Sequence, residues 1–119
     1  MNSIKSYKDL IVWQKSMLVV SKIYLVSKSF PTDEKFGLTN QIRRCSVSIP
    51  SNIAEGYGRN STNDYKRFLQ IALGSLYELQ TQIEIAKNLE YIELTTFEEV
   101  FSLCIEIDKM LYTIIKKIN

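Results

Sequence analysis

The chain has 119 residues, of which 45% are apolar and 24% are charged, a composition typical of one folded domain rather than a disordered segment. It contains no histidine, which excludes histidine-based nucleophilic triads, histidine-ligated zinc and the Glu-x-x-His sites of di-iron bundles. The net charge is +2, but residues 1–67 carry 11 basic and 5 acidic side chains, whereas residues 68–119 carry 4 and 8. The basic part is either a surface for a polyanion or a chance result of which helix faces meet water.

The N-terminal residues contain no apolar segment of the kind that a signal peptide requires, and no part of the chain approaches about 18 consecutive uncharged apolar residues. We therefore expect a cytoplasmic protein that does not contact a membrane. The two cysteines, Cys45 and Cys104, lack the spacing of a metal site or a redox motif, so we expect buried free thiols. No cofactor and no metal site are expected.

A first helix is predicted over residues 7–30, where apolar residues recur at steps of three and four before Pro31 ends the pattern. A second helix is predicted over residues 32–56 and begins near two acidic residues, which favour the positive end of a helix dipole. Pro50 lies inside this second helix and removes one backbone hydrogen bond, so we expect a kink there. The residues of the first helix predicted to face the core are Leu10, Trp13, Met17, Val20 and Tyr24.

After a glycine-rich connection at residues 56–60, a third helix is predicted over residues 61–89, with the Ser61 side chain as its cap. A fourth helix is predicted over residues 95–118, again from steps of three and four. No segment alternates apolar and polar residues with period two, so no strand is predicted. Four helices joined by short connections predict an all-α fold, an antiparallel up-down-up-down four-helix bundle that forms a single domain over residues 1–119.

Two of the predicted helices carry more apolar residues than a single core-facing stripe requires. The first helix has a second stripe about 100° from the predicted core face, and the fourth helix has a second ridge. These additional residues are Ile11, Leu18, Leu25, Phe101, Ile105 and Tyr112. Contiguous apolar ridges on a surface usually mark an interface, so we predict a homo-oligomer built partly on these two helices. The alternative is a wider core that buries the same residues.

Basic residues gather on the second helix, in the following connection and at the start of the third helix. Arginine binds phosphate groups through two parallel hydrogen bonds, and backbone N–H groups near a helix end can assist. We therefore predict a set of nucleic-acid contacts that consists of Arg43, Arg44, Arg59, Lys66 and Arg67.

Asn52 and Glu55 lie near the apolar face of the second helix, close to Pro50. A polar pair there either links the kink to a neighbouring helix by hydrogen bonds or forms a polar site, and we favour the structural role. Gly56 and Gly58 precede a helix, but they follow a helix rather than a strand and lack the Gly-Lys-Ser/Thr of a phosphate-binding loop. We interpret these glycines as a connection that terminates the second helix.

Several runs of sequence together carry a resemblance to a known family. They are Tyr7-Lys-Asp-Leu-Ile-Val-Trp-Gln-Lys15, Phe30-Pro31 with Phe36-Gly37-Leu38, Gln41-Ile-Arg-Arg-Cys-Ser-Val-Ser-Ile49 followed by Asn52-Ile-Ala-Glu-Gly56 and Gly58-Arg59, and Phe68-Leu-Gln-Ile-Ala-Leu-Gly-Ser-Leu76 with Glu78-Leu79. In these runs the chain resembles the four-helix-bundle family of 23S rRNA intervening-sequence proteins. That family includes the accessory variability proteins of diversity-generating retroelements.

The resemblance implies a small bacterial cytoplasmic protein, an up-down bundle and a homopentamer with a central channel, with no established enzymatic activity. The retroelement relatives bind nucleic acid and a reverse transcriptase through basic surfaces. Arg44, Asn52, Glu55, Gly56 and Arg59 match the family signature by position. Packing where the second helix meets the third can explain all five of them.

Together, these observations favour a non-catalytic oligomeric bundle that binds RNA, or a nucleic-acid complex with a protein such as a reverse transcriptase, through a basic surface. The alternative is a protein-binding scaffold that makes no nucleic-acid contact. An enzyme, for example a nuclease, is disfavoured because the sequence contains neither histidine nor an acidic metal-binding cluster.

Overall fold

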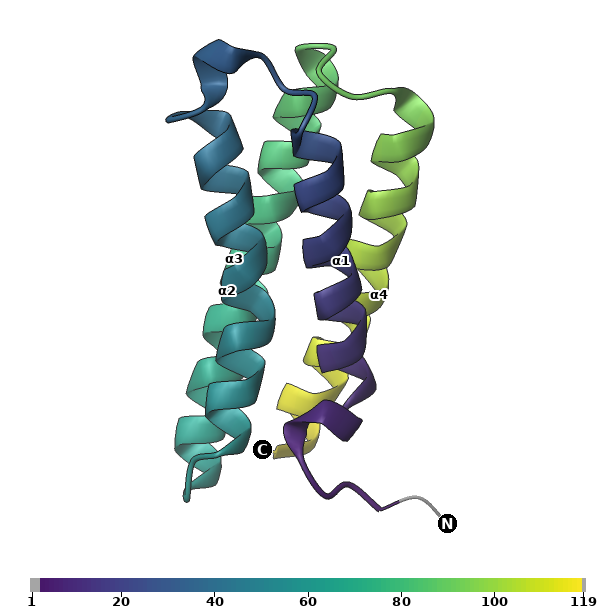
Figure 1. Ribbon diagram of the computed structural model, residues 1–119. Coiled ribbons are helices and arrows are strands. Elements are labelled where there is room, and N and C mark those ends of the chain that lie inside the picture. The colour runs from purple at the N-terminus through teal and green to yellow at the C-terminus, as the bar shows by residue number, and fades with distance from the viewer. Residues whose placement is uncertain (1–2, 119) are drawn as a thin grey trace.

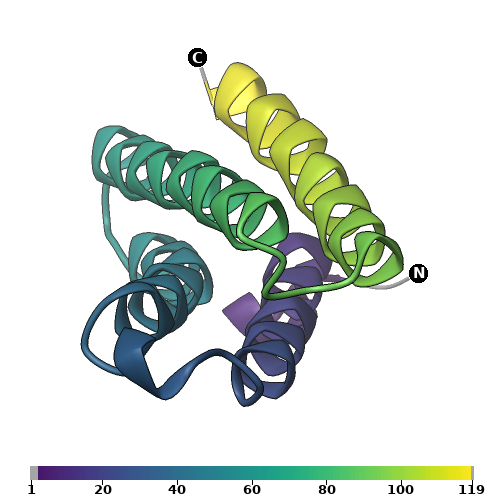
Figure 2. The ribbon, with the colours of Figure 1, turned by 90° about the horizontal axis from the view of Figure 1, so that it is seen from above.

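The computed structural model describes residues 3–118 and contains, over that range, four α-helices, two short 3-10 helices and no strand. Neighbouring helices run in opposite directions, which confirms the all-α, four-helix fold class (Figure 1). Figure 2 shows the helices arranged in a ring in chain order, with α4 beside α1. The elements are η1 (Tyr7–Asp9), α1 (Ile11–Ser27), η2 (Thr32–Glu34), α2 (Leu38–Tyr57), α3 (Thr62–Asn88) and α4 (Leu94–Ile118).

The long axis of the bundle separates two sets of connections. The bundle measures 43 × 27 × 21 Å, and its length follows from helices of 17 to 27 residues. The α2–α3 connection, η1 and the last turn of α4 lie at one end, whereas η2 and the α3–α4 connection lie at the other (Figure 1). Segments that are far apart in the sequence are therefore neighbours at each end.

The first helix is shorter than the predicted span of residues 7–30. Leu10 is extended (φ −72°, ψ 123°) and separates η1 from α1, and the Asp9 carboxylate accepts the backbone N–H of Ser6 to close η1 as its own capped turn. At the other end the chain leaves the helix after Ser27, which allows Phe30 to be buried against the Tyr91 ring at 5.5 Å between centroids. At both ends, α1 therefore stops where a local or tertiary contact replaces the helical hydrogen bonds.

The second helix also starts later than the predicted residue 32. One carboxylate oxygen of Glu34 accepts the backbone N–H of Leu38 at 3.1 Å, and the other accepts the hydroxyl of Tyr91 at 2.8 Å. Glu34 therefore acts from outside α2 as its cap and ties η2 to the α3–α4 connection. This arrangement lowers the pKa of Glu34, first through the Leu38 hydrogen bond and then through that from Tyr91. The bounds of α3 and α4 lie within one residue of those predicted.

The face of α1 that enters the core differs from the predicted one. Met17 and Tyr24 are 42% and 41% exposed, whereas Val12, Val19 and Ile23 are buried together with Ser16 and Ser27. Serine is compatible with this core because its hydroxyl bonds within its own helix, as Ser16 Oγ does to the carbonyl of Val12 at 2.7 Å. The small serine side chains let α1 pack with a face that hydrophobicity alone does not identify.

The cores of α3 and α4 follow the predicted pattern of steps of three and four. The buried residues of these two helices include Leu69, Ala72, Leu76, Leu79, Ile83, Ala86, Val100, Cys104, Ile107 and Leu111. Both cysteines are free and buried, as expected from the sequence. Each helix therefore contributes one continuous stripe to a single core.

Candidate nucleic-acid interface

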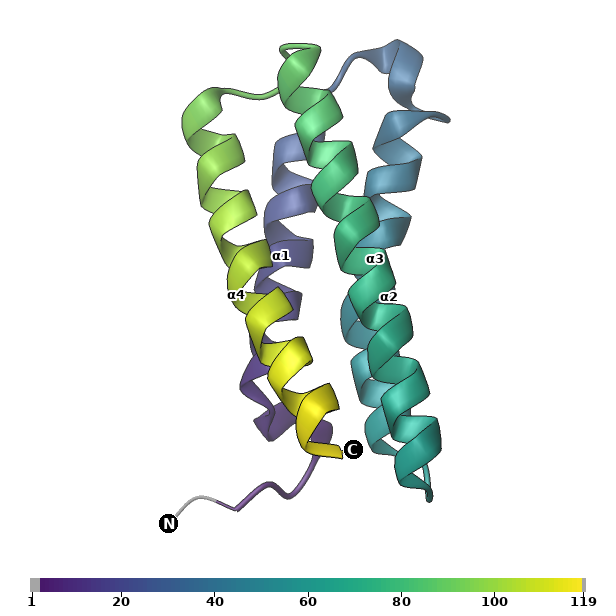
Figure 3. The same ribbon diagram turned by 180° about the vertical axis from the view of Figure 1, so that it is seen from behind.

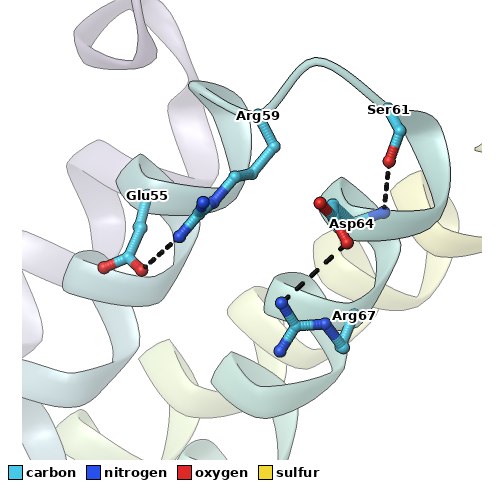
Figure 4. Close-up of polar contacts among 5 residues, drawn as sticks. All are labelled: Glu55, Arg59, Ser61, Asp64 and Arg67. Atoms are coloured by element: carbon cyan, nitrogen blue, oxygen red, sulfur yellow. Dashed lines mark hydrogen bonds and ion pairs between the residues drawn. The ribbon is translucent and has the colours of Figure 1, made fainter.

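Two arginines stack on one buried phenylalanine beside the α2–α3 connection. The guanidinium carbons of Arg59 and Arg67 lie 4.7 and 4.6 Å from the centroid of the Phe68 ring, within the range of a cation–π interaction. Arg59 also pairs with Glu55 at 3.0 Å, and Arg67 approaches Asp64 at 3.9 Å (Figure 4). The ring thus positions two guanidinium groups at one end of the bundle.

The local sequence explains why the chain turns here. The Ser61 Oγ accepts the backbone N–H of Asp64 at 3.1 Å, so Ser61 caps α3 as predicted (Figure 4). Gly56 is buried in the last turn of α2, where a Cβ atom would lie 2.6 Å from the Cβ of Phe68. Only glycine allows α2 and α3 to approach this closely, so Gly56 determines how near Arg59 comes to the Phe68 ring.

Of the five predicted nucleic-acid contacts, three come together. Arg59, the half-buried Lys66 and Arg67 lie in or next to the α2–α3 connection. Arg44 precedes Arg59 by 15 residues, most of them helical, which corresponds to about 20 Å along the axis of α2 at 1.5 Å per residue. The five predicted residues therefore lie in two groups separated along α2, and their contact with nucleic acid stays a prediction.

Arg43 is occupied by contacts with α1. Its Nε donates to the Oγ of Ser27 at 2.8 Å, a terminal nitrogen donates to the carbonyl of Tyr24 at 3.4 Å, and the guanidinium lies 4.9 Å from the Tyr24 ring centroid. A cation near the C-terminal end of a helix also interacts favourably with its dipole. These contacts give Arg43 a structural role in joining α2 to α1, and its predicted contact with nucleic acid stays a prediction.

Arg44 lies on a different side of α2 from its neighbour, since successive residues are about 100° apart around a helix. It is exposed and lines a pocket of about 350 Å³ between α2 and α3, together with Glu78 of α3. Within residues 3–118 the side chain of Arg44 makes no ion pair or hydrogen bond. Its guanidinium is therefore available at a second polar site, away from the α2–α3 connection.

Charge is separated along the bundle axis. The ion pair between Lys15 and Glu106, at 3.2 Å, is left out of the following count. Of the other charged side chains, the half of the bundle that contains the α2–α3 connection carries eight basic and four acidic ones, and the other half carries six basic and eight acidic ones. We call the first half the basic end. Its basic residues are Lys5, Lys8, Arg59, Lys66, Arg67, Lys109, Lys116 and Lys117.

The sequence prediction missed five of these basic residues, because they come from the two terminal segments of the chain rather than from the α2–α3 region. The signal was present in the up-down order of the helices, which places η1 and the last turn of α4 beside the α2–α3 connection (Figure 1). The missed residues are Lys5, Lys8, Lys109, Lys116 and Lys117.

The signature residues Asn52 and Glu55 have separate surroundings. Asn52 Nδ2 donates to the carbonyl of Ser48 at 2.7 Å and to its hydroxyl at 3.0 Å, and that hydroxyl meets the hydroxyl of Ser75 on α3 at 2.8 Å. Asn52 therefore helps to link α2 to α3 in the turn that contains Pro50. Glu55 is exposed and pairs with Arg59 instead, so the two residues do not act as one polar pair.

The apolar residues predicted for an oligomer interface divide into two classes. Ile11, Leu18 and Leu25 of α1 are 59%, 48% and 67% exposed and form one ridge at seven-residue spacing, which we call the α1 ridge. On α4, by contrast, Ile105 is half-buried, and so is Phe101, which packs on the core and on Phe97 at 5.2 Å between ring centroids. The alternative of a wider core thus applies to these two residues, while Tyr112 is 61% exposed.

No helix within residues 3–118 combines the length and the apolarity needed to cross a membrane. Over the same range, no three cysteine and acidic side chains are grouped so that they could hold a metal ion.

Comparisons with known proteins match most of the chain. The family model of the 23S rRNA-intervening sequence protein matches residues 8–113. A crystal structure of a protein of unknown function from the S23 ribosomal protein family, from Bacteroides thetaiotaomicron, is 31% identical and superposes with a TM-score of 0.83. The match covers 89% of this chain and 99% of that one. No curated protein gives a significant match. The bundle, its signature residues and these matches agree that the chain belongs to the family of 23S rRNA-intervening sequence proteins.

Proposed function

We propose that this protein is a non-catalytic, homo-oligomeric bundle that binds RNA through its basic end. The observation that carries the proposal is the separation of charge along the bundle, which leaves eight basic and four acidic side chains at that end. Such a surface attracts a polyanion, and the opposite, acidic half repels it, so the charge distribution also favours one orientation of binding.

The arginines on Phe68 are suited to phosphate contacts. Their partners Glu55 and Asp64 are exposed, and exposed ion pairs contribute only about 0–1 kcal/mol, so a phosphate can replace them at small cost. The Phe68 ring holds both guanidinium planes, which reduces the side-chain entropy lost on binding. Phosphate contacts of this kind carry no base information and support binding that is general in sequence.

The α1 ridge supports the oligomeric part of the proposal. Three large exposed apolar side chains recur at seven-residue spacing along α1, and burying them against another copy removes that surface from water. In a ring of parallel copies, such as the homopentamer that the family resemblance implies, all basic ends would lie on one rim. The rim would then bind one RNA through several copies at once.

The RNA proposal predicts that RNA affinity depends on where the basic side chains lie and not only on the net charge. Neutralising Arg59, Lys66 and Arg67 to glutamine is expected to weaken binding of single-stranded RNA by about tenfold or more at 50 mM salt. The slope of log K against log salt should fall by about 2, as three lost phosphate contacts require. Fluorescence anisotropy with a labelled oligonucleotide at 50–200 mM salt measures both quantities.

The matched control neutralises Lys22, Lys28 and Lys35, which lie in the acidic half. It makes the same change in net charge and is expected to alter the affinity less than about twofold, because these groups lie away from the proposed contacts. Equal losses in the two triple variants, or no RNA binding by the wild type at 50 mM salt, would contradict the proposal. Protein partners that stay bound after nuclease treatment would then favour the scaffold alternative.

The oligomer prediction concerns the α1 ridge. Leu18→Glu places a charge in the middle of the ridge and is expected to convert the assembly to a species of about 13.8 kDa, the mass of one chain. Light scattering coupled to size-exclusion chromatography measures this mass. Ser102→Glu, at an exposed position of α4, is the control and should leave the assembly intact. A wild-type mass near 13.8 kDa at micromolar concentration would rule the oligomer out.

A further inference from the structure

The pocket between α2 and α3 is lined by polar groups from both helices, which run side by side (Figure 3). Asn40, Gln41 and Arg44 line it from about one turn of α2, and Glu78 lines it from α3. The volume of about 350 Å³ is at the lower end of the range for small-molecule pockets, roughly 300–1,000 Å³. The pocket is therefore large enough for a single aromatic base and too small for a folded partner.

Some of the polar groups that line this pocket are paired with one another, since the Ser48 and Ser75 hydroxyls meet at 2.8 Å and the Cys45 thiol donates to the carbonyl of Ser75 at 2.9 Å, but the two charged groups are not. Arg44 and Glu78 line the same pocket without forming an ion pair, and within residues 3–118 the side chains of Asn40 and Gln41 make no hydrogen bond. A cation and an anion that face one pocket unpaired can each bind a complementary group of one ligand.

The carboxylate of Glu78 is held in place while it keeps acceptor capacity. Its Oε2 accepts from Nε2 of Gln82 at 3.1 Å, one turn further along α3. Gln82 is buried, and its own Oε1 has no hydrogen-bond partner among the described residues. A carboxylate has about four lone-pair sites, so Glu78 can still accept two hydrogen bonds from a ligand.

This combination of groups specifies the ligand. Arg44 requires two adjacent acceptors for its two parallel N–H groups, and Glu78 requires two adjacent donors. Guanine presents both on one ring system, with O6 and N7 as acceptors and N1–H and the N2 amino group as donors. Adenine, cytosine and uracil each lack at least one of these two pairs. We propose that the pocket between α2 and α3 binds a guanine base through Arg44 and Glu78.

The source of the guanine is either an unpaired nucleotide of an RNA chain or a free nucleotide. The pocket lies about 20 Å along α2 from the basic end, which several nucleotides of single-stranded RNA can span. An RNA held by its phosphates at the basic end can thus place one base in the pocket. The base-binding proposal is nevertheless independent, since it concerns different residues from the phosphate contacts.

The first experiment compares two short oligonucleotides, an all-uridine chain and the same chain with one central guanine. We expect the guanine-containing chain to bind the wild type about tenfold more tightly, as one well-formed bidentate contact provides. Arg44→Lys keeps the charge but removes the planar fork, and Glu78→Gln removes the paired acceptors, so each is expected to abolish the preference. Glu84→Gln, which lies on the same helix as Glu78 and does not line the pocket, is the matched control and should retain it.

A second measurement identifies the source of the base. Guanosine monophosphate is expected to shift the side-chain amide NMR signals of Asn40 and Gln41, whereas uridine monophosphate is not. A response to the free nucleotide without a preference between the oligonucleotides identifies a free-nucleotide site, and a preference without that response identifies a base read within RNA. Absence of both, or a guanine preference that persists in both pocket variants, overturns the inference. Unchanged salt-dependent binding of the all-uridine chain would leave the basic-end proposal standing in that case.

Discussion

Replacing Gly56 by alanine is expected to destabilise the fold by about 1–3 kcal/mol, the usual cost of forcing an additional group into a closely packed site. The added Cβ would lie 2.6 Å from the Cβ of Phe68 and 3.3 Å from the carbonyl oxygen of Tyr65. Neither atom belongs to the flexible end of a side chain, so α2 and α3 must move apart to accommodate it. The free energy of unfolding from urea titrations measures the effect.

Gly74 provides a matched control in the same bundle. It lies in the middle of α3, is exposed, and a Cβ built on it meets nothing within 4 Å. Gly74→Ala should therefore stabilise the protein by about 0.5–1 kcal/mol, because alanine has the higher helix propensity. Gly56 is also helical, so the same gain in helix propensity applies to Gly56→Ala. The difference between the two variants in the free energy of unfolding therefore measures the cost of the steric conflict at Gly56.

Truncating Phe68 to alanine should not rescue Gly56→Ala, since the Cβ of residue 68 remains. A shift of both glycine variants in the same direction would contradict this account. Rescue by the Phe68 truncation would contradict it as well, because the conflict would then come from the ring rather than from the approach of the backbones.

Regular patterns predicted the parts of the fold that depend on one helix at a time. The alternating steps of three and four in α3 and α4 run without interruption, so their bounds and buried faces could be predicted closely. The start of α2 could not, because the Glu34 carboxylate that caps it is also bound by the hydroxyl of Tyr91, 57 residues later. Contacts between distant residues of this kind leave no local pattern in a single sequence.

The face of α1 could not be identified from hydrophobicity, because this helix carries several apolar stripes. The stripe that enters the core is the one that includes Ser16 and Ser27, since small side chains permit close packing. The exposed α1 ridge of Ile11, Leu18 and Leu25, in contrast, was predicted as surplus apolar surface and is exposed in the single chain. Its occupation by another copy stays a prediction.

The candidate site likewise has one part that the local sequence predicts and one part that depends on contacts between helices. Arg59 and Arg67 are brought together by one short connection, so their proximity could be predicted from spacing. The pocket with Arg44 and Glu78 depends on the register between α2 and α3, which the sequence does not specify locally. Adjacent residues on a helix also diverge by about 100°, and this separates Arg43 from Arg44 although they are consecutive.

High pH is expected to destabilise the fold through its two buried cysteines. Burial raises the pKa of both thiols from 9.0 to about 12, and for Cys45 the nearby Glu78 carboxylate adds to the effect. Above pH 9 the unfolded chain loses both protons while the native chain keeps them, so unfolding releases protons. Stability therefore falls as the pH rises, by about 1.4 kcal/mol per pH unit for each thiol, until the native thiols also ionise near pH 12.

The test compares the wild type with the double variant Cys45→Ser/Cys104→Ala by urea titration at pH 8, 9.5 and 10.5. Serine at position 45 can still donate to the carbonyl of Ser75, which the Cys45 thiol meets at 2.9 Å. The double variant starts less stable at pH 8 because Cys104 is fully buried, but its stability should fall less with pH. Relative to the variant, the wild type should lose about 4 kcal/mol between pH 8 and pH 10.5, since the two proteins differ only at these two positions. Parallel stability curves would mean that the native thiols ionise near their ordinary pKa and that the packing around them admits water.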